Sequence, residues 1–324
     1  MSDDAIIVVV AGLTATACGL LGPFLLLRRM ALLSDAVSHA VLPGIVAVWL
    51  VAQTRAPLPV IAGAAAFAVI CVLSVDGLRS TGLVASDAAI ALTFPALFSI
   101  GVLGITRFAA GIHLDLDATI YGELALVPFT TVQLGGVELA RAALVLGAVA
   151  LADLALLVLL WKEFAATTFD PDFAAAVRLR PTLLTRLLVI AVAVTAVSAF
   201  EAVGAILVVT MLVVPAATAF VLTRRLPTMV AVSVAVGWIG AVGGQRLAFA
   251  TDSSIAGAMG LVCAGCFVVA LLVRQVPRWR LGVDRWLQRL YDRGWLLMPI
   301  RRVEDRGLTH LRAEAEGLRR TRVR

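Results

Sequence analysis

The chain has 324 residues, of which 61% are hydrophobic, and its mean hydropathy is +1.01. This apolar content excludes an ordinary soluble globular protein, and repeated runs of about 20 apolar residues predict a polytopic membrane protein. The net charge of +6 is a property of the C-terminus: the residues from Arg274 onward hold 14 arginines and 6 acidic residues, whereas the rest of the chain has a net charge of −2.

Nine apolar stretches predict an all-α bundle of about eight or nine transmembrane helices. Their expected ranges are 5–27, 33–52, 57–77, 84–106, 141–161, 183–199, 203–222, 228–248 and 254–273. The first stretch follows an acidic start, MSDD, which is unlike the basic start of a cleaved signal peptide. Segment 108–140 is only moderately apolar, and we expect an outer loop with short interfacial or re-entrant helices there.

The basic residues of the loops orient these spans. One side of the predicted membrane carries most of them: Arg28, Arg29, Arg79, Lys162, Arg178, Arg180, Arg224, Arg225 and the arginine-rich tail. The positive-inside rule makes this side cytoplasmic, with Arg55 and Arg107 as exceptions on the other side. The sequence therefore predicts a multi-pass protein of the cell (inner) membrane, with its N-terminus outside and its C-terminus in the cytoplasm.

Asp35 and His39 lie four residues apart in SDAVSHAVLPGIVAVWLV, at the start of the second predicted span. At this spacing both side chains project from one face of a helix. A carboxylate and an imidazole can ligate zinc, manganese or iron, and ionisable groups at membrane depth commonly mark a pathway. The alternative is that both residues only cap or hydrogen-bond the start of the helix.

The chain has no P-loop, the motif with which many ATPases bind ATP. Its single lysine, Lys162, is not part of a G-x-x-x-x-G-K-[ST] motif, so ATP-driven transport would need a separate ATPase subunit.

Cys263 and Cys266 form a C-x-x-C inside an apolar run, where packing between helices is favoured over a redox or zinc role. The prolines Pro43, Pro95 and Pro215 fall inside spans, as in many transport pathways, and argue against a mere membrane scaffold.

The longest predicted cytoplasmic loop, 162–182, contains a helix-start signal. Asp170 suits the N-cap position and Pro171 the first helical position, so a short amphipathic helix is expected from Asp172 onward. It is either an ordinary interfacial helix or a helix that inserts into a partner protein, with Phe169 and Phe173 as anchors.

Four stretches of the chain together resemble a known family. They are LLGPFLLLRRMALLSDAVSHAVLPGIVAVWL, SDAAIALTFPALFSIGVL, WKEFAATTFDPDFAAAVRL and AVGAILVVTMLVVPAATAFVLTRRL, and they cover most of residues 10–225. In this order they resemble the membrane permeases of the manganese, zinc and iron ABC importers. The resemblance implies a type II ABC importer-like fold and a permease subunit without an ATPase site or an intrinsic cofactor.

The same resemblance implies partners and site residues. The partners are a second permease copy in a homo- or heterodimer, two copies of a cytoplasmic ABC ATPase that binds the ATP, and an extracytoplasmic metal-binding protein. No nucleic acid is expected, and membrane lipid surrounds the spans. Asp35 and His39 match the family's D-x-x-x-H, which meets the transported Mn, Zn or Fe ion. FDPDFAAA, with Phe169, Asp170, Pro171, Asp172 and Phe173, matches the coupling helix that docks on the ATPase.

The chain departs from the family's pattern at two places. Glu201 stands where a neutral polar residue such as Gln is expected, and is either an additional metal ligand or a solvated residue at the interface. The second departure is the arginine-rich tail, which is too short for a complete winged-helix regulator. We therefore expect a permease domain at 1–274, with its coupling helix near 170–178, and a basic cytoplasmic extension at 275–324.

These observations predict the permease subunit of an ATP-driven importer of manganese, zinc or iron ions. Two alternatives remain open from the residues. One is an ABC permease for a chelated metal cargo such as a siderophore, which would need a wider pathway. The other is an ion-coupled secondary carrier, which would need no ATPase.

The outer loop contains His113, Asp115 and Asp117. These residues either attract the ion at the mouth of the pathway or are merely solvated.

Overall fold

The computed structural model describes residues 3–53, 57–108, 124–134 and 137–275. Their long helices are α1 (Asp3–Leu27), α2 (Ala31–Ala52), α3 (Pro57–Ser80), α4 (Ser86–Phe108), α6 (Arg141–Leu159), α9 (Pro181–Val203), α10 (Ala205–Leu222), α11 (Leu226–Thr251) and α12 (Ile255–Gln275). Each matches one of the nine predicted spans to within a few residues. Two shorter helices, α7 (Trp161–Phe169) and α8 (Pro171–Ala176), connect α6 to α9.

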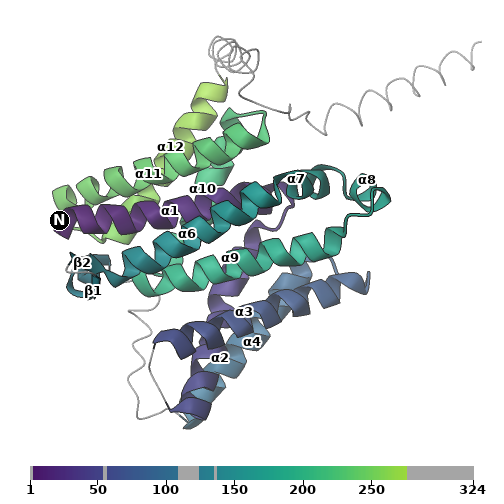
Figure 1. Ribbon diagram of the computed structural model, residues 1–324, viewed down its shortest axis with the longest axis horizontal. Coiled ribbons are helices and arrows are strands. Elements are labelled where there is room, and N and C mark those ends of the chain that lie inside the picture. Colours follow the sequence, from purple (N-terminus) through teal and green to yellow (C-terminus); the bar gives the residue numbers. More distant parts are fainter. Residues whose placement is uncertain (1–2, 54–56, 109–123, 135–136, 276–324) are drawn as a thin grey trace, which may run out of the picture.

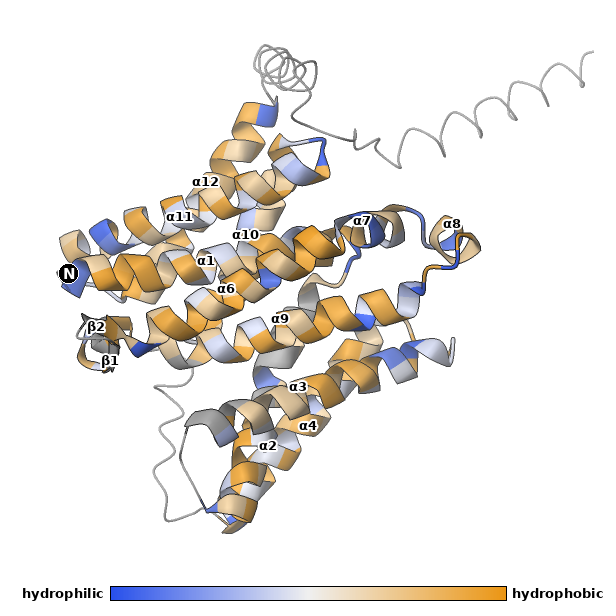
Figure 2. Ribbon diagram, viewed as in Figure 1, coloured by the Kyte–Doolittle hydropathy of each residue, from blue (hydrophilic) through white to orange (hydrophobic). Residues whose placement is uncertain are grey.

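Eight of these helices contain a segment long and apolar enough to cross a membrane, within the described part of the chain. The ninth is α2, whose run from Leu42 to Ala52 is apolar but shorter. In Figure 2 apolar residues dominate the long helices, while hydrophilic residues gather mainly at their ends and around α7 and α8. The predicted all-α transmembrane bundle is therefore confirmed.

Helix α9 occupies the middle of the bundle (Figure 1). It contacts α3 and α2 on one side and α1, α6 and α10 on the other. Helices α2, α3 and α4 pack together as one group, while α1, α10, α11 and α12 form a second group. The bundle thus has two helical groups joined largely through α9.

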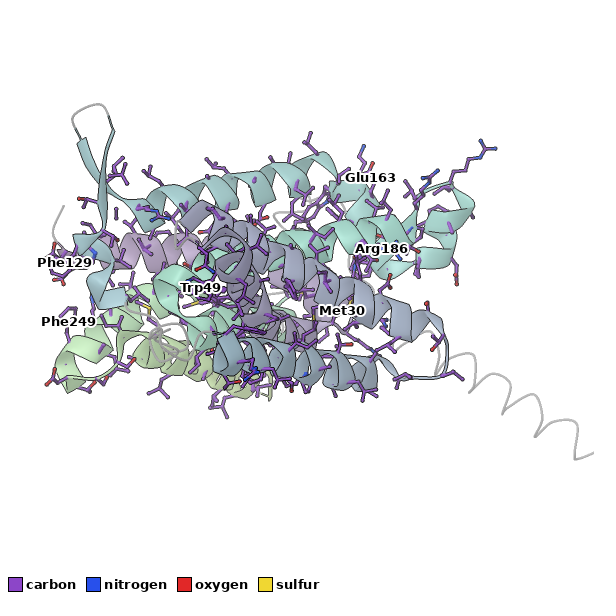
Figure 3. All side chains as sticks on the ribbon, turned by 90° about the horizontal axis from the view of Figure 1, so that it is seen from below. Met30, Trp49, Phe129, Glu163, Arg186 and Phe249 are labelled. Atoms are coloured by element: carbon purple, nitrogen blue, oxygen red, sulfur yellow. The ribbon has the colours of Figure 1, made fainter. Side chains whose placement is uncertain are left out.

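The two ends of the bundle differ. One end, here named the α8 end, carries α7, α8 and the connection between α1 and α2 (Figure 1). The opposite end, the hairpin end, carries the N-terminus and the strands β1 (Thr131–Leu134) and β2 (Val137–Ala140). Figure 3 shows Phe129 and Phe249 at the hairpin end and Glu163 toward the α8 end.

Segment 108–140 follows the expectation of short interfacial or re-entrant helices only in part. Residues 109–123, which include His113, Asp115 and Asp117, lie outside the described residues. The remainder forms a 3-10 helix, η1 (Leu124–Phe129), and an antiparallel hairpin that pairs Thr131 with Ala140 and Leu134 with Val137. The sequence carried a signal for this hairpin, since Gly135-Gly136 between two β-prone runs is a typical two-residue turn.

Local breaks in the long helices follow from glycine and proline. Gly204 has φ +80° and ψ 157°, a conformation that L residues rarely adopt, and it separates α9 from α10. Pro43, Pro95 and Pro215 lie inside α2, α4 and α10, as expected. Each removes one backbone donor from its helix, so these helices deform more readily than an uninterrupted one.

Glycines bring the backbones of neighbouring helices into contact. A Cβ on Gly22 of α1 would overlap the backbone carbonyl of Leu212 on α10, and a Cβ on Gly44 of α2 would overlap the backbone of Gly63 on α3. Such approaches are the usual way in which helices associate in lipid, where burial of apolar area drives association poorly.

We expect Gly22→Ala to destabilise the fold by about 1–3 kcal/mol, because the rigid carbonyl of Leu212 leaves no room for a methyl group. The measurement is the melting temperature of the purified protein in detergent. Gly265→Ala on α12 is the matched control, since a Cβ there meets no atom within 4 Å. The control should be neutral or slightly stabilising through helix propensity, and equal melting temperatures for both variants would contradict the prediction.

Candidate functional site

The candidate metal residues lie on α2, shortly after a tight connection from α1. Arg29 adopts a left-handed conformation with φ 58°, and Met30 N–H donates to the Leu25 carbonyl at 2.9 Å while Arg29 N–H donates to the Leu26 carbonyl at 3.1 Å. This pattern is a Schellman motif, which ends α1 and directs the chain at once into α2. Asp35 and His39 are therefore placed in the first turns of α2, at the α8 end.

His39 faces α4. Its ring is half-buried and lies 5.3 Å from the ring of Phe94, at an interplanar angle of 32°, and 5.6 Å from that of Phe98, at 81°. Two aromatic contacts fix the plane of the imidazole, so its orientation is set by α4 rather than by α2 alone. Asp35 precedes it by one helical turn; the side chains of Asp35 and Glu201 are outside the part that the structure describes.

A groove lies between α2, α3 and α4, along the part of α2 that follows His39. Its volume is about 450 Å³. Its lining is apolar except for one arginine: Pro43, Val46, Ala47, Leu50, Phe67, Ile100, Leu103, Gly104, Arg107 and Phe108. Pro43 and Leu50 follow His39 at spacings of four and eleven residues and so share its helix face. The helix face that carries the imidazole thus continues along this apolar groove.

No three His, Cys, Asp or Glu residues come together as a metal-ion cluster among the described residues. Cys263, which the sequence assigned to packing, is buried, and its Sγ lies 4.0 Å from Sδ of Met211 on α10. A Cβ on Gly240 of α11 would overlap this sulfur atom. The thiol therefore fills a close contact between three helices, in agreement with the packing interpretation.

The predicted helix after Asp170 is present as α8. The Asp170 carboxylate accepts a hydrogen bond from Phe173 N–H at 2.9 Å, and Pro171 occupies the first helical position. Arg178, in a left-handed conformation with φ 65°, ends α8: its N–H donates to the Ala175 carbonyl, and Leu179 N–H donates to that of Ala174. Capping at both ends holds together a helix of six residues that would not persist alone.

Apolar side chains are exposed along this loop. Phe169, Phe173 and Val177 are 39%, 58% and 51% exposed, and they recur at intervals of four residues. The loop also packs against the bundle, because Ala174 is fully buried and α8 contacts α7 and α9. Here we name Phe169–Arg178 the docking loop. An apolar surface between charged residues on a well-capped helix is suited to insertion into a partner protein.

Two polar features of the bundle were not found from the sequence. Arg28 donates hydrogen bonds to hydroxyl groups of α7 and α9. From the sequence it was only one of the basic loop residues that orient the spans in the membrane. Asp153, in the middle of α6, is 4% exposed and accepts a hydrogen bond from Thr195 of α9 at 2.7 Å. Asp153 could have been found from the sequence, because a carboxylate inside an apolar run is unusual. The partners of Arg28 could not, because they are more than a hundred residues away in the chain.

Known proteins resemble this chain over most of its length. It is 39% identical over 273 residues to the manganese transport system membrane protein MntD of Bacillus subtilis (strain 168), covering 84% of this chain and 92% of that protein. It is 38% identical over 266 residues to the zinc transport system membrane protein TroD of Treponema pallidum (strain Nichols), covering 82% and 72%.

A solved structure shares the fold. It is PsaBC from Streptococcus pneumoniae in complex with Fab, at a TM-score of 0.70 and 24% identity, covering 86% of this chain and 94% of that chain. The model of the ABC 3 transport family matches residues 4–274, a range that contains every helix described above apart from the ends of α1 and α12. Because this match extends over the whole helical bundle, the chain belongs to the ABC 3 transport family.

Proposed function

We propose that this chain is the membrane permease subunit of an ATP-driven importer of manganese, zinc or iron ions. The observation that carries the proposal is the similarity of more than four-fifths of the chain to membrane proteins of manganese and zinc transport systems. The chain lacks a P-loop, so a separate cytoplasmic ABC ATPase, in two copies, binds and hydrolyses the ATP. An extracytoplasmic metal-binding protein delivers the ion, and a second permease copy completes the pathway.

The α8 end is the cytoplasmic end in this proposal. It carries Arg28, Arg29, Arg79, Lys162, Arg178, Arg180, Arg224 and Arg225, and the positive-inside rule places such an end in the cytoplasm. The N-terminus and the β-hairpin then face outward. The basic segment 275–324 is a cytoplasmic extension of the permease domain 1–274, where it meets anionic lipid or the ATPase.

Asp35 and His39 act on the metal ion during its passage. The ion enters from the hairpin end and reaches His39 along the side of the apolar groove. One carboxylate and one imidazole from each permease copy replace part of the ion's hydration shell, and such a small ligand set binds loosely enough for release. Glu201, in the last turn of α9, adds a further carboxylate near the outer end of the pathway.

The docking loop is the contact with the ATPase. Phe169 and Phe173 supply exposed aromatic surface, while the Asp170 cap and Pro171 hold α8 in the helical conformation. Asp172 adds a negative charge in the first turn, which the helix dipole stabilises. Movement of the ATPase subunits on ATP binding is thereby transferred to the helices, which alternately open the pathway to each side.

The decisive experiment reconstitutes the permease with its ATPase in proteoliposomes, adds the binding protein, and measures uptake of radiolabelled manganese, zinc and iron. Uptake that requires both ATP and the binding protein supports the proposal. Uptake driven by an ion gradient without the ATPase would instead identify a secondary carrier. Uptake of a metal chelate that free ions fail to inhibit would identify a permease for chelated cargo.

A further inference from the structure

Arg28 joins three helices at the α8 end. It follows directly after α1, and its guanidinium donates to three threonine hydroxyls: Nε to Thr168 Oγ1 at 3.0 Å, Nη2 to Thr167 Oγ1 at 2.8 Å, and Nη1 to Thr185 Oγ1 at 2.5 Å. Thr167 and Thr168 belong to the last turn of α7, and Thr185 belongs to the first turns of α9. We name these four residues the Arg28 clamp.

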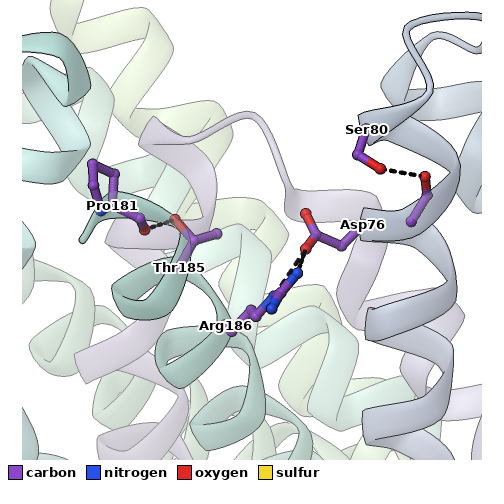
Figure 4. A network of polar contacts seen from close by, with 6 residues as sticks. Asp76, Ser80, Pro181, Thr185 and Arg186 are labelled. Atoms are coloured by element: carbon purple, nitrogen blue, oxygen red, sulfur yellow. Dashed lines mark hydrogen bonds and ion pairs between the residues drawn. The ribbon is translucent and has the colours of Figure 1, made fainter. Parts of the chain in front are cut away.

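The hydroxyl groups of the clamp are fixed as acceptors. Each one donates its own proton to a backbone carbonyl of its helix: Thr167 to Glu163 at 2.8 Å, Thr168 to Phe164 at 2.6 Å, and Thr185 to Pro181 at 2.9 Å. Figure 4 shows the hydrogen bond from the Thr185 hydroxyl to the Pro181 carbonyl. Their lone pairs therefore point away from their own helices and receive the guanidinium N–H groups, so the planar fork of Arg28 determines the spacing of α7 from α9.

The clamp is partly shielded from solvent. Burial lowers the pKa of the Arg28 guanidinium to about 10, and the group stays protonated at neutral pH. The three hydrogen bonds of the guanidinium all go to neutral hydroxyl groups. Hydrogen bonds to hydroxyls hold the group in place without neutralising it, and they can be exchanged one at a time when a helix shifts.

An aromatic cluster fixes α7 on the same end of α1. The Phe24 ring lies 5.9 Å from that of Phe164 and 6.0 Å from that of Trp161, the latter in an edge-on arrangement. Phe24 and Phe164 are completely buried. Because α7 ends at Phe169, where the docking loop begins, a displacement of the docking loop is transmitted through α7 to Phe24 and Arg28.

The end of α1 is in turn closely connected to α2. Only Arg28, Arg29 and Met30 separate the two helices, the Schellman hydrogen bonds fix their backbone, and Met30 is 6% exposed. From Ala31 to His39 the helix rises by about 12 Å. A shift of Arg28 therefore moves the start of α2, and the helix carries that movement to the candidate metal residues as a stiff element.

We infer that Arg28 is a positioning residue that couples the docking loop to the metal-binding helix α2, by holding α7, α9 and the α1–α2 connection in one unit. This role rests on the proposed function. The ion pair between Arg186 and Asp76, at 2.8 Å, also connects two helices at this end, α9 and α3 (Figure 4). Both side chains are substantially exposed, and the Arg186 guanidinium donates to Asp76 rather than to the threonines of α7. The Arg186–Asp76 ion pair therefore supplies a matched control for substitutions at Arg28.

The experiment measures ATP hydrolysis and metal uptake in the same proteoliposomes, with the complete transporter and the binding protein. Arg28→Lys keeps the charge but lacks the planar fork, and Thr168→Val combined with Thr185→Val removes two acceptors while keeping their shape. For both variants we expect the ATPase to co-purify as in the wild type and to hydrolyse ATP, while uptake per ATP falls about tenfold, equivalent to ~1.4 kcal/mol of coupling. Arg186→Lys should stay within about twofold of the wild-type ratio.

A second measurement separates coupling from mere stability. Hydrogen exchange of the backbone amides of residues 30–42 should change on nucleotide binding in the wild type and in Arg186→Lys, but not in the clamp variants. An unchanged uptake per ATP in the clamp variants overturns the inference, as does a parallel loss of ATP hydrolysis and uptake. If Arg28→Lys does not assemble, the double threonine variant decides in the same way. Failure of the wild type to transport any metal ion would instead refute the proposed function itself.

Discussion

Replacing His39 with phenylalanine is expected to reduce metal uptake by about 100-fold or more, while the protein remains folded. The phenyl ring preserves the contacts with Phe94 and Phe98, which lie 5.3 and 5.6 Å from the imidazole. It lacks the nitrogen lone pairs that ligate a divalent ion, so only the ligand is removed. The measurement is initial uptake of radiolabelled manganese, zinc and iron, together with expression and melting temperature.

The companion changes at Asp35 follow the same logic. Asp35→Ala removes a carboxylate ligand and should also abolish uptake, whereas Asp35→Glu retains an oxygen ligand and should retain part of the activity. Trp49→Phe, farther along α2, is the control and should transport normally. Normal uptake by His39→Phe or Asp35→Ala at wild-type expression would show that α2 does not supply ligands to the ion.

Loss of the docking anchor Phe173 is expected to have the second-largest effect. Its side chain is 58% exposed, and an aromatic anchor at the centre of an interface typically contributes roughly 2 kcal/mol or more of binding free energy. Phe173→Ala should therefore weaken co-purification of the ATPase by at least about tenfold and lower ATP-dependent uptake accordingly. Leu151→Ala, on a 68% exposed residue within the α6 span, is the matched control and should leave the complex intact.

Asp170 tests the conformation of the same loop. Its carboxylate accepts the Phe173 N–H at 2.9 Å, so Asp170→Lys removes the cap and places a cation at the positive end of the helix dipole. We expect uptake and ATPase binding to fall together. Asp170→Asn retains a good capping acceptor and should behave nearly as the wild type. If Asp170→Lys and Phe173→Ala both keep coupled transport, the docking loop is not the ATPase contact.

Much of the fold was predictable because the relevant signals are local. The thickness of the bilayer fixes the length of an apolar run, which is why α1, α10 and α12 begin and end within a few residues of their predicted spans. The same holds for α8, since Asp170 and Pro171 are adjacent to the helix that they start. The signal for the pairing of β1 with β2 is equally local, since two glycines lie in the sequence between two β-prone runs.

The candidate site was predictable only in part. The residue types and the spacing of Asp35 and His39 could be read directly, but the contacts of His39 with Phe94 and Phe98 come from a helix more than fifty residues away. The apolar groove beyond His39 likewise needs three helices to form. The periodicity of one helix shows which residues lie on the same face of that helix. It contains no information on which neighbouring helix covers that face.

The sequence by itself determined the membrane class, the helical spans, the lack of a P-loop and the capped helix α8, because each depends on composition or on residues within a few positions of one another. The tertiary structure alone decided that Arg28 meets Thr167, Thr168 and Thr185, which lie 139 to 157 residues away. A guanidinium in a loop is equally compatible with solvent, lipid or a buried partner. Only the packing of α1 against α7 and α9 brings the three hydroxyls to one point, and with them the connection between the docking loop and α2.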